Sequence, residues 1–338
     1  MLLKNRLTAP NAGVRLRQIV QWAFFCWIIF SGIQFGLFVS HYTAGGSAPV
    51  SSRPAGIEGF LPIGALVSFK HWLVNGTFDP LHPAALVLFL TFLALATLTK
   101  NSFCGWLCPV GALHDPLAAL GRRFWGRNFR IWRPLDVLLR SLKYLLLLFF
   151  LNTILFGMPA DAVRSFLASP YWAVADVKML HFFMRPSTLS LTVVALLALL
   201  ALGLRNFWCR YLCPYGALLG LLSLLSPIKV HRDAGGCTGC QACSRNCPQQ
   251  IAVHRCATVR SQECTACLTC ISRCPEPGVL SLRVPLWRQP VPTFWFALLV
   301  LGLFAAGVTS GMLSGHWQTV LTDVDYRQLI PVADRFGH

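Results

Sequence analysis

Apolar residues along this chain are gathered in five long blocks. The blocks cover residues 19–39, 81–99, 136–156, 188–204 and 291–313. A helix needs about 20 mainly apolar residues to cross the hydrocarbon core of a bilayer. The few charged residues inside the blocks lie near their ends. The pattern therefore predicts five membrane-spanning helices.

Composition agrees with a membrane protein. Hydrophobic residues make up 55% of the 338 residues and charged residues only 12%, which is about half the usual charged share of a soluble domain. The first block has too long an apolar core for a signal peptide and lacks a small-residue cleavage site. It is predicted to remain as a membrane anchor.

Basic residues predict the orientation, because Lys and Arg are kept on the cytoplasmic side of a membrane. Of the 29 basic residues, 22 lie in the N-terminal arm with Lys4 and Arg6, in residues 100–143 and in residues 205–288. We therefore expect a multi-pass protein of the bacterial inner membrane, with those three segments cytoplasmic and the C-terminus periplasmic. This topology and attraction to anionic lipid explain the net charge of +17, so no nucleic acid partner is expected.

Eight of the 14 cysteines form two runs with the spacing C-x2-C-x2-C-x3-C-P. The runs are Cys237, Cys240, Cys243, Cys247 and then Cys264, Cys267, Cys270, Cys274. This spacing is typical of bacterial iron–sulfur proteins. A zinc site would need one tetrad, usually two pairs with a longer spacer, and disulfides are disfavoured in the reducing cytoplasm. The runs predict two [4Fe–4S] clusters and an electron-transfer function.

A different cysteine pattern occurs twice. Residues 103–113 and 208–218 share the frame aromatic-Cys-x-aromatic-Leu-Cys-Pro-x-Gly-Ala-Leu. Each copy follows a predicted outside-to-inside span, so the copies have the same orientation and predict a parallel repeat about an axis along the membrane normal. Such symmetry would bring Cys104, Cys108, Cys209 and Cys213 near one axis at the membrane surface.

Three roles stay open for these four thiols. They are ligands of a third metal centre, a redox-active dithiol or copper-handling site, or buried structural thiols. Pro109 and Pro214 disfavour a helical conformation at the preceding cysteine and suit the start of a new helix. The two remaining cysteines, Cys26 and Cys256, are expected to be structural.

Residues 230–285 resemble the bacterial two-cluster ferredoxins, including the apolar stretch after each Cys-Pro pair. The resemblance implies that the fourth cysteine of each run crosses to the other cluster. One cluster would then be held by Cys237, Cys240, Cys243 and Cys274, and the other by Cys264, Cys267, Cys270 and Cys247.

The whole arrangement resembles the NapH/NosR-type membrane polyferredoxins, in which two Cys-x3-Cys-Pro motifs in a membrane core precede a ferredoxin segment. The stretch from Arg53 to Leu66 is similar to the NosR branch. The resemblance implies quinol-dependent electron delivery, maturation of copper enzymes or reduction of cupric ions. A partner reductase, dehydrogenase or copper enzyme system is expected.

The predicted fold is an all-α polytopic membrane protein with an internal parallel repeat and an inserted α+β ferredoxin-like module. We expect a membrane domain over residues 1–229, the two-cluster module over 230–285, and a fifth helix with a periplasmic tail over 286–338.

Quinol is the expected donor, and no residue is assigned a catalytic role. Candidate proton acceptors on the outer side are Glu58, His71, Asp79 and His82, of which the first two lie in an apolar loop, residues 58–75, suited to re-entering the membrane. We expect an electron-transfer subunit of a quinol-dependent oxidoreductase rather than a free-standing enzyme. The alternatives are a copper-ion reductase or maturation factor acting through the four repeat thiols, and an assembly scaffold with structural clusters.

Overall fold

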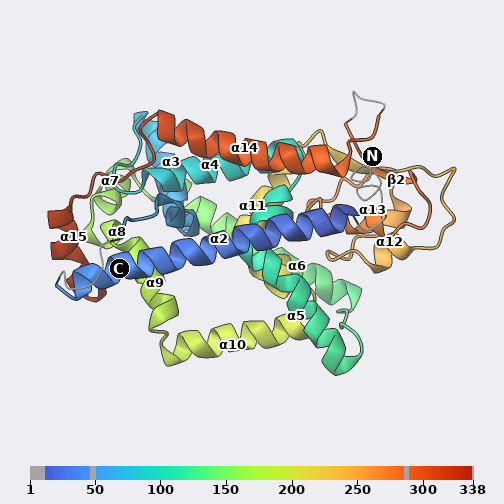
Figure 1. Ribbon diagram of the computed structural model, residues 1–338, viewed down its shortest axis with the longest axis horizontal. Coiled ribbons are helices and arrows are strands. Elements are labelled where there is room, and N and C mark those ends of the chain that lie inside the picture. The colour runs from blue at the N-terminus through green and yellow to red at the C-terminus, as the bar shows by residue number, and fades with distance from the viewer. Residues whose placement is uncertain (1–11, 46–50, 285–288, 337–338) are drawn as a thin grey trace. The chain divides into compact units, whose positions relative to one another are not determined.

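The computed structural model describes residues 12–45, 51–284 and 289–336, and most of this part of the chain is helical (Figure 1). Three basic residues that contributed to the predicted orientation, Lys4, Arg6 and Arg288, lie outside the described residues.

A helix occupies each of the five apolar blocks. These helices are α2 (Ala12–Thr43), α4 (Pro83–Thr99), α6 (Arg133–Leu151), α10 (Thr188–Gly203) and α14 (Thr293–Leu313). By length and composition, α2, α14 and the continuous segment of α6 with the π-helix η3 (Asn152–Gly157) can cross a membrane. Helix α10 forms a pair with α9 (Ala175–Met184) that is bent by 73°, and α4 is a shorter apolar helix of 17 residues. The protein is therefore an integral membrane protein, while the count of five spans stays a prediction.

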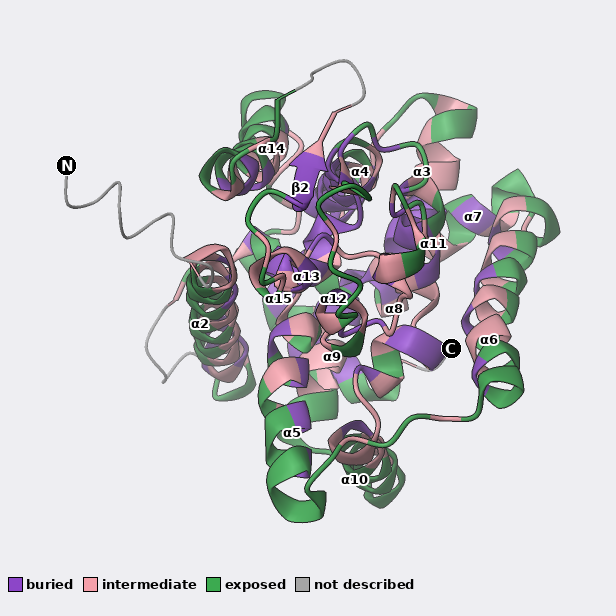
Figure 2. Ribbon diagram, turned by 90° about the vertical axis from the view of Figure 1, so that its right-hand side faces the viewer, coloured by how far each residue is buried: buried purple, intermediate pink, exposed green. Residues whose placement is uncertain are grey.

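The long helices expose their apolar side chains. Figure 2 shows α2, α6, α10 and α14 mostly exposed or partly exposed along their length. Large exposed side chains include Trp27, Phe149, Leu199 and Trp295. Contiguous apolar surface of this kind is unfavourable in water and favourable in lipid. The exposure thus supports membrane insertion of these helices.

The chain divides into two compact units. The first contains residues 1–25, 92–147 and 196–304, and the second contains residues 26–91, 148–195 and 305–338. Each of the five long helices contributes residues to both units. The predicted three-part division of the chain stays a prediction.

The first unit contains the cysteine runs and both copies of the repeat. Its shorter elements are η2 (Phe103–Leu107), α5 (Pro109–Trp125), η4 (Trp208–Leu212), α11 (Pro214–Leu222), β1 (Lys229–Arg232), α12 (Ala242–Arg245), η5 (Val253–Arg255), α13 (Thr269–Ser272) and β2 (Leu280–Arg283). Strands β1 and β2 are antiparallel, with Val230 opposite Leu282. Both of these side chains are buried, so the sheet joins the two ends of the cysteine-rich segment around an apolar centre (Figure 1).

The second unit is built from short helices on an aromatic core. Its elements include η1 (Ala55–Phe60), α3 (Pro62–Asn75), α7 (Ala160–Leu167), α8 (Pro170–Ala173), α15 (Asp323–Leu329) and η6 (Ile330–Arg335). Phe35 and Phe38 of α2 pack with Val177, Tyr326 and Ile330 in one buried cluster. Burying such side chains contributes about 1.5–3 kcal/mol each relative to exposure.

Residues 58–75, the connection suited to re-entering the membrane, consist of the end of η1 and helix α3, and their re-entry stays a prediction. Pro62 begins α3 and Gly76, with φ of 71°, ends it in the left-handed conformation that glycine adopts without strain. Lys70 lies on this helix and donates to the carbonyls of Ile154, Leu155 and Met158. These carbonyls at the end of η3 have no helical partner, and the ammonium group supplies one.

Candidate functional site

The two cysteine runs have the same backbone course. Positive φ angles occur at Gly239 and Gln241 in the first run and at the equivalent Ala266 and Leu268 in the second. A short helix, α12 or α13, begins directly afterwards. Left-handed residues other than glycine cost about 1–3 kcal/mol and persist where the surroundings determine them. The repeated left-handed positions curl each run so that its first three cysteines line one cavity.

The first cavity is lined by Cys237, Cys240, Cys243 and Cys274. Three of these come from the first run and the last from the second run. Arg232, His254 and Glu276 also line the cavity, and Cys240 is exposed. The first cavity therefore has charged side chains in its lining and one exposed cysteine.

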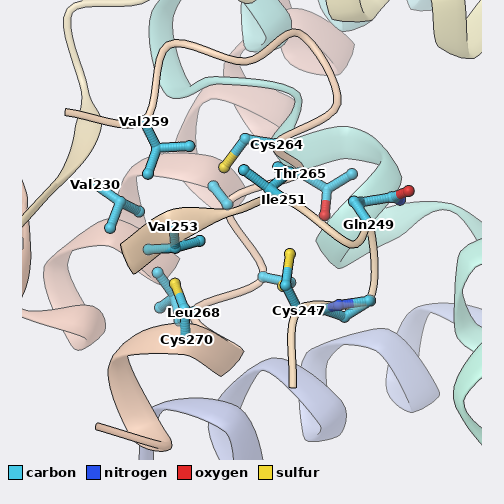
Figure 3. Close-up of a pocket in the computed structure, with 13 residues that line it drawn as sticks. Val230, Cys247, Gln249, Ile251, Val253, Val259, Cys264, Thr265, Leu268 and Cys270 are labelled. Carbon is cyan, nitrogen blue, oxygen red and sulfur yellow. The ribbon is translucent and has the colours of Figure 1, made fainter. Parts of the chain in front are cut away.

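The second cavity is lined by Cys247, Cys264, Cys267 and Cys270. Figure 3 shows the sulfurs of Cys247, Cys264 and Cys270 around one space. The rest of the lining is mainly apolar, namely Val230, Pro248, Ile251, Val253, Val259, Ala266 and Leu268 with Gln249 and Thr265. These two sets of four cysteines are the two sets that the ferredoxin resemblance implies.

The donor sets fit iron–sulfur clusters, which are held by four thiolates each. Burial and the neighbouring Cys267 raise the pKa of Cys247 to about 12, because crowded thiolates repel one another in a low-dielectric site. The amide of Gly239 and the guanidinium of Arg232 lower the pKa of Cys237. Positively charged iron would offset the repulsion in the second cavity, since it binds the thiolate form.

The first copy of the repeat contacts Thr265 and Ala266, which line the second cavity. Trp106 is fully buried, and its Nε1 donates to the carbonyl of Ala266 at 3.0 Å. A Cβ added at Gly105 would collide with the carbonyl oxygen of Thr265, so only glycine permits this approach. Both residues lie between Cys104 and Cys108. The thiols of this copy are therefore carried by a segment in direct contact with the second cavity.

The second copy makes equivalent contacts. Arg210, at the position of Gly105, donates to the carbonyl of Gln249, which lines the second cavity. The same guanidinium pairs with Asp136 of α6 at 2.8 Å, and the Tyr211 hydroxyl donates to that carboxylate at 2.7 Å. A buried charge is tolerated when it is paired and hydrogen-bonded in this way.

A buried ion pair adds a third attachment. Lys143 of α6 donates to both carboxylate oxygens of Glu263 at 2.8 and 2.7 Å. Glu263 immediately precedes Cys264, and the Tyr144 hydroxyl also donates to it at 3.1 Å. Residues at the second cavity are thus hydrogen-bonded to α6 and to both copies of the repeat.

The repeat cysteines have matching local structures. Cys104 and Cys209 lie in the π-helical turns η2 and η4, while Cys108 and Cys213 are extended residues that precede Pro109 and Pro214 at the starts of α5 and α11. The expectation from the prolines is confirmed. The Cys213 sulfur accepts from the Gly216 amide at 3.2 Å, as an N-cap does. π-helical turns are frequent at functional sites.

The four repeat thiols lie close enough to influence one another. Burial and the charges of Cys108, Cys213 and Cys104 raise the pKa of Cys209 well above its usual value, and burial raises the pKa of Cys108 to about 11. His114 of α5 places Nε2 3.1 Å from the Cys209 sulfur. Its Nδ1 is buried without a hydrogen-bond partner, and burial lowers the pKa of His114 to about 4, so the ring is neutral.

Sequence reasoning missed several of these contacts. His114 has no histidine counterpart in the second copy, where Leu219 occupies the equivalent position. Trp106 and Tyr211 were visible as the shared aromatic of the frame, but the frame alone does not say what they touch. The ion pair of Lys143 and Glu263 joins residues 120 positions apart, and no local pattern indicates it.

The outer candidates are partly brought together. Glu58 and His82 are fully buried, and His82 Nδ1 lies 3.3 Å from Glu58 Oε1. Arg53, which sequence reasoning quoted only for its family resemblance, contacts Glu58 at 2.8 Å and Asp176 at 2.7 Å. His82 Nε2 lies 2.8 Å from the carbonyl of Trp172, so this nitrogen carries a proton.

The other two outer candidates have separate surroundings. Asp79 is fully buried and accepts from Trp172 Nε1 at 2.7 Å, which links it to His82 through one side chain. His71 lies apart, beside Asn75 and Thr77. The structure therefore groups Glu58 with His82, connects Asp79 indirectly and leaves His71 outside.

Comparison with known families agrees with the cysteine chemistry. A family model described as "4Fe-4S binding domain" matches residues 81–128 and 185–232, the segments that carry the Cys-x3-Cys-Pro motifs. A model described as "4Fe-4S dicluster domain" matches residues 229–275. Together with the apolar helices, these matches define an iron–sulfur protein of the ferredoxin type in a membrane.

The chain belongs to the NapH/NosR-type membrane polyferredoxins, as its motifs predicted. It is 42% identical over 315 residues to YccM of Escherichia coli K12, provisionally described as an electron transport protein, with 92% of this chain and 88% of YccM covered. Iron–sulfur electron transfer is therefore the general activity of the protein.

More distant relatives share parts of the chain. Regulatory protein NosR of Pseudomonas aeruginosa is 33% identical over 214 residues, which cover 61% of this chain and 28% of NosR. Ferredoxin-type protein NapH of Escherichia coli K12 is 29% identical over 151 residues, which cover 44% of this chain and 48% of NapH. No solved structure matches the chain.

Proposed function

We propose that this protein passes single electrons from quinol in the bilayer to a redox partner in the cytoplasm. The observation that carries the proposal is the second cavity, because the carbonyls of its lining residues Ala266 and Gln249 accept hydrogen bonds from both segments that bear the repeat thiols. Such fastening keeps two thiol-rich sites at a fixed separation, which long-range electron transfer requires. As a subunit, the protein would serve a partner reductase, dehydrogenase or copper enzyme.

We assign a [4Fe–4S] cluster to each cavity. Cys237, Cys240, Cys243 and Cys274 would hold one, and Cys264, Cys267, Cys270 and Cys247 the other. When bound, each cluster supplies a one-electron redox couple. The chain's own part is to hold the thiolates, exclude water from the second cavity and expose one edge of the first.

We also assign a third metal centre to Cys104, Cys108, Cys209 and Cys213. A bilayer has about 30 Å of hydrocarbon, so electrons from its outer side need a carrier in the membrane part. The mutual effects of the four thiols and the contact of His114 with Cys209 support one shared site. The "4Fe-4S binding domain" match over both copies supports iron–sulfur chemistry there.

Quinol oxidation releases two electrons and two protons, so a proton acceptor is needed. The buried pair of Glu58 and His82 is the best candidate, because the two groups lie 3.3 Å apart and carboxylate and imidazole are the usual proton acceptors in proteins. Arg53 and Asp176 complete a network of two possible cations and two carboxylates. With the predicted topology, this network is on the periplasmic side of the bacterial inner membrane and the N-terminus and ferredoxin module are cytoplasmic.

The proposal is tested by reducing the protein with a quinol analogue. Anaerobically purified protein in lipid vesicles should show cluster reduction by electron paramagnetic resonance after the analogue is added. Glu58→Gln and His82→Gln should slow this reduction while leaving reduction by dithionite unchanged. Failure of the wild-type protein to be reduced by any quinol analogue, with dithionite still effective, would contradict quinol as the donor.

A copper-ion reductase or maturation factor is the second candidate function. The contact of His114 with the Cys209 sulfur favours it, since Cu(I) prefers thiolate ligands and imidazole also suits copper. Each electron delivered would convert one Cu(II) to Cu(I). Replacing Cys104 and Cys209 by serine should then abolish reduction of added cupric ion while both ferredoxin-type signals persist.

A further inference from the structure

The two cavities differ in what covers them. Three residues outside the ferredoxin segment donate hydrogen bonds to the backbone or side chains around the second cavity. Trp106 donates to Ala266, Arg210 to Gln249 and Lys143 to Glu263. Ala266 and Gln249, which receive the first two contacts, are buried. A soluble protein therefore has no direct approach to this loop from the side of those contacts.

The first cavity has an open rim. Thr238, Gly239, Cys240 and Gln241 are consecutive and all exposed. Three of them line the cavity, including the sulfur donor Cys240. Electron transfer falls steeply with distance, so a partner's redox centre must come close to an exposed edge of this kind. The rim is that edge.

Three arginine residues lie close in sequence to residues that line the first cavity. Arg245, Arg255 and Arg273 are exposed and stand within two residues of Cys243, His254 and Cys274, which line the first cavity. Arg232 lines the cavity itself, and the acidic residues nearby are Asp233 and Glu276. Fixed positive charge on a surface raises the association rate of a negatively charged partner, by about 10- to 1,000-fold in strong cases.

We propose that the rim of the first cavity, with Arg245, Arg255 and Arg273, is the docking surface for an acidic soluble electron-transfer protein. This inference rests on the proposed electron transfer and adds its exit point and the charge of the partner. Electrons enter the ferredoxin segment at the second cavity and leave at the first.

The test measures electron transfer from the reduced, full-length protein to two acceptors by stopped flow. An acidic flavodoxin serves as the docking probe, and a neutral benzoquinone reports whether the clusters are present and reactive. For the wild-type protein, the rate with flavodoxin should fall as salt is added, because salt screens exposed charges. The rate with benzoquinone should not depend on salt.

The variant Arg245→Glu, Arg255→Glu, Arg273→Glu should lower the low-salt rate with flavodoxin by about tenfold or more and remove its salt dependence. The matched control reverses three exposed arginines at the end of α5: Arg122→Glu, Arg123→Glu, Arg127→Glu. It carries the same change in net charge and should alter the rate by less than about twofold if docking is local. Benzoquinone rates and visible absorbance check that both variants keep their clusters.

An unchanged flavodoxin rate in the rim variant, or an equal loss in the control variant, overturns the docking site. Loss of binding to vesicles containing phosphatidylserine, with the flavodoxin rate kept, also overturns it, because the arginines would then face lipid. If neither benzoquinone nor flavodoxin oxidises the wild-type protein, electron transfer itself is refuted, and that result is distinct from both others.

Discussion

The two cavities share one sequence frame but have different surroundings. Both have four cysteines, two left-handed residues and a short helix in the same order. Apart from its cysteines, the second cavity has a mainly apolar lining, and its loop contacts α6 and the repeat. The first cavity has charged side chains in its lining and exposes Cys240. Exposure and neighbouring charges set the potential of an iron–sulfur cluster over a wide range. We therefore propose that residues outside the shared motif give the two sites different tasks.

Replacing one cysteine ligand in each cavity should give the largest difference in quinol-driven reduction. In Cys264→Ser, quinol-driven reduction of both centres should stop, because electrons would enter through the second cavity. In Cys240→Ser, the second-cavity centre should still be reduced by the quinol analogue. Electron paramagnetic resonance after quinol addition, with dithionite as a control for content, measures both. Quinol-driven reduction of the first-cavity centre in Cys264→Ser would break the proposed order.

The ion pair behind the second cavity should have the next largest effect. Lys143→Met leaves the buried Glu263 carboxylate uncompensated, which should lower the free energy of unfolding by about 3–5 kcal/mol. Adding Glu263→Gln should recover part of the loss. Arg140→Met is the control, since its pair with Asp136 is partly exposed and should be worth less than about 1 kcal/mol. Thermal denaturation in detergent compares them, and equal losses in both single variants would contradict the account.

Trp106→Phe should act on the second cavity alone. It removes the donor to the Ala266 carbonyl, and leaving that buried acceptor unpaired should cost about 1–3 kcal/mol. The midpoint potential of the second-cavity centre should shift while that of the first-cavity centre stays constant. Trp132→Phe, at an exposed tryptophan, is the control. Potentiometric titration with spin resonance detection would contradict the contact's role if both potentials moved together.

The smallest effect is expected at the first cavity. Arg232→Gln removes a positive charge that stabilises the thiolate of Cys237, so the first-cavity potential should become slightly more negative. The shift should shrink at high salt, because the site is open to solvent. Arg260→Gln, an exposed arginine beside the second-cavity residue Val259, should leave that potential unchanged. A larger shift in Arg260→Gln than in Arg232→Gln would reverse the assignment.

Local sequence patterns predicted the long helices and the helix starts after the two Cys-Pro pairs of the repeat. The five apolar blocks each became a helix, and Pro109 and Pro214 begin helices as expected. Apolar periodicity and proline both act on the local backbone, so they can be interpreted without knowledge of the fold. Within the connection of residues 58–75, Pro62 and Gly76 mark the start and end of a helix that the sequence analysis did not assign.

The long-range contacts around the second cavity and the repeat thiols could not be predicted in this way. Trp106 and Ala266 are 160 residues apart, and nothing near either one shows that they meet. The same holds for His114 and Cys209, where only one copy of the repeat has the histidine. Such contacts depend on the packing of whole helices, which a single sequence does not reveal.

The most direct test of the account is the iron and acid-labile sulfide content of anaerobically purified protein. With clusters in both cavities and a third at the repeat thiols, each should be about twelve atoms per chain, and a value of about eight would leave the repeat thiols without a cluster. A matching loss of about four iron atoms should follow from Cys264→Ser. Protein that is folded but free of iron, or that contains zinc in its place, would contradict the central claim.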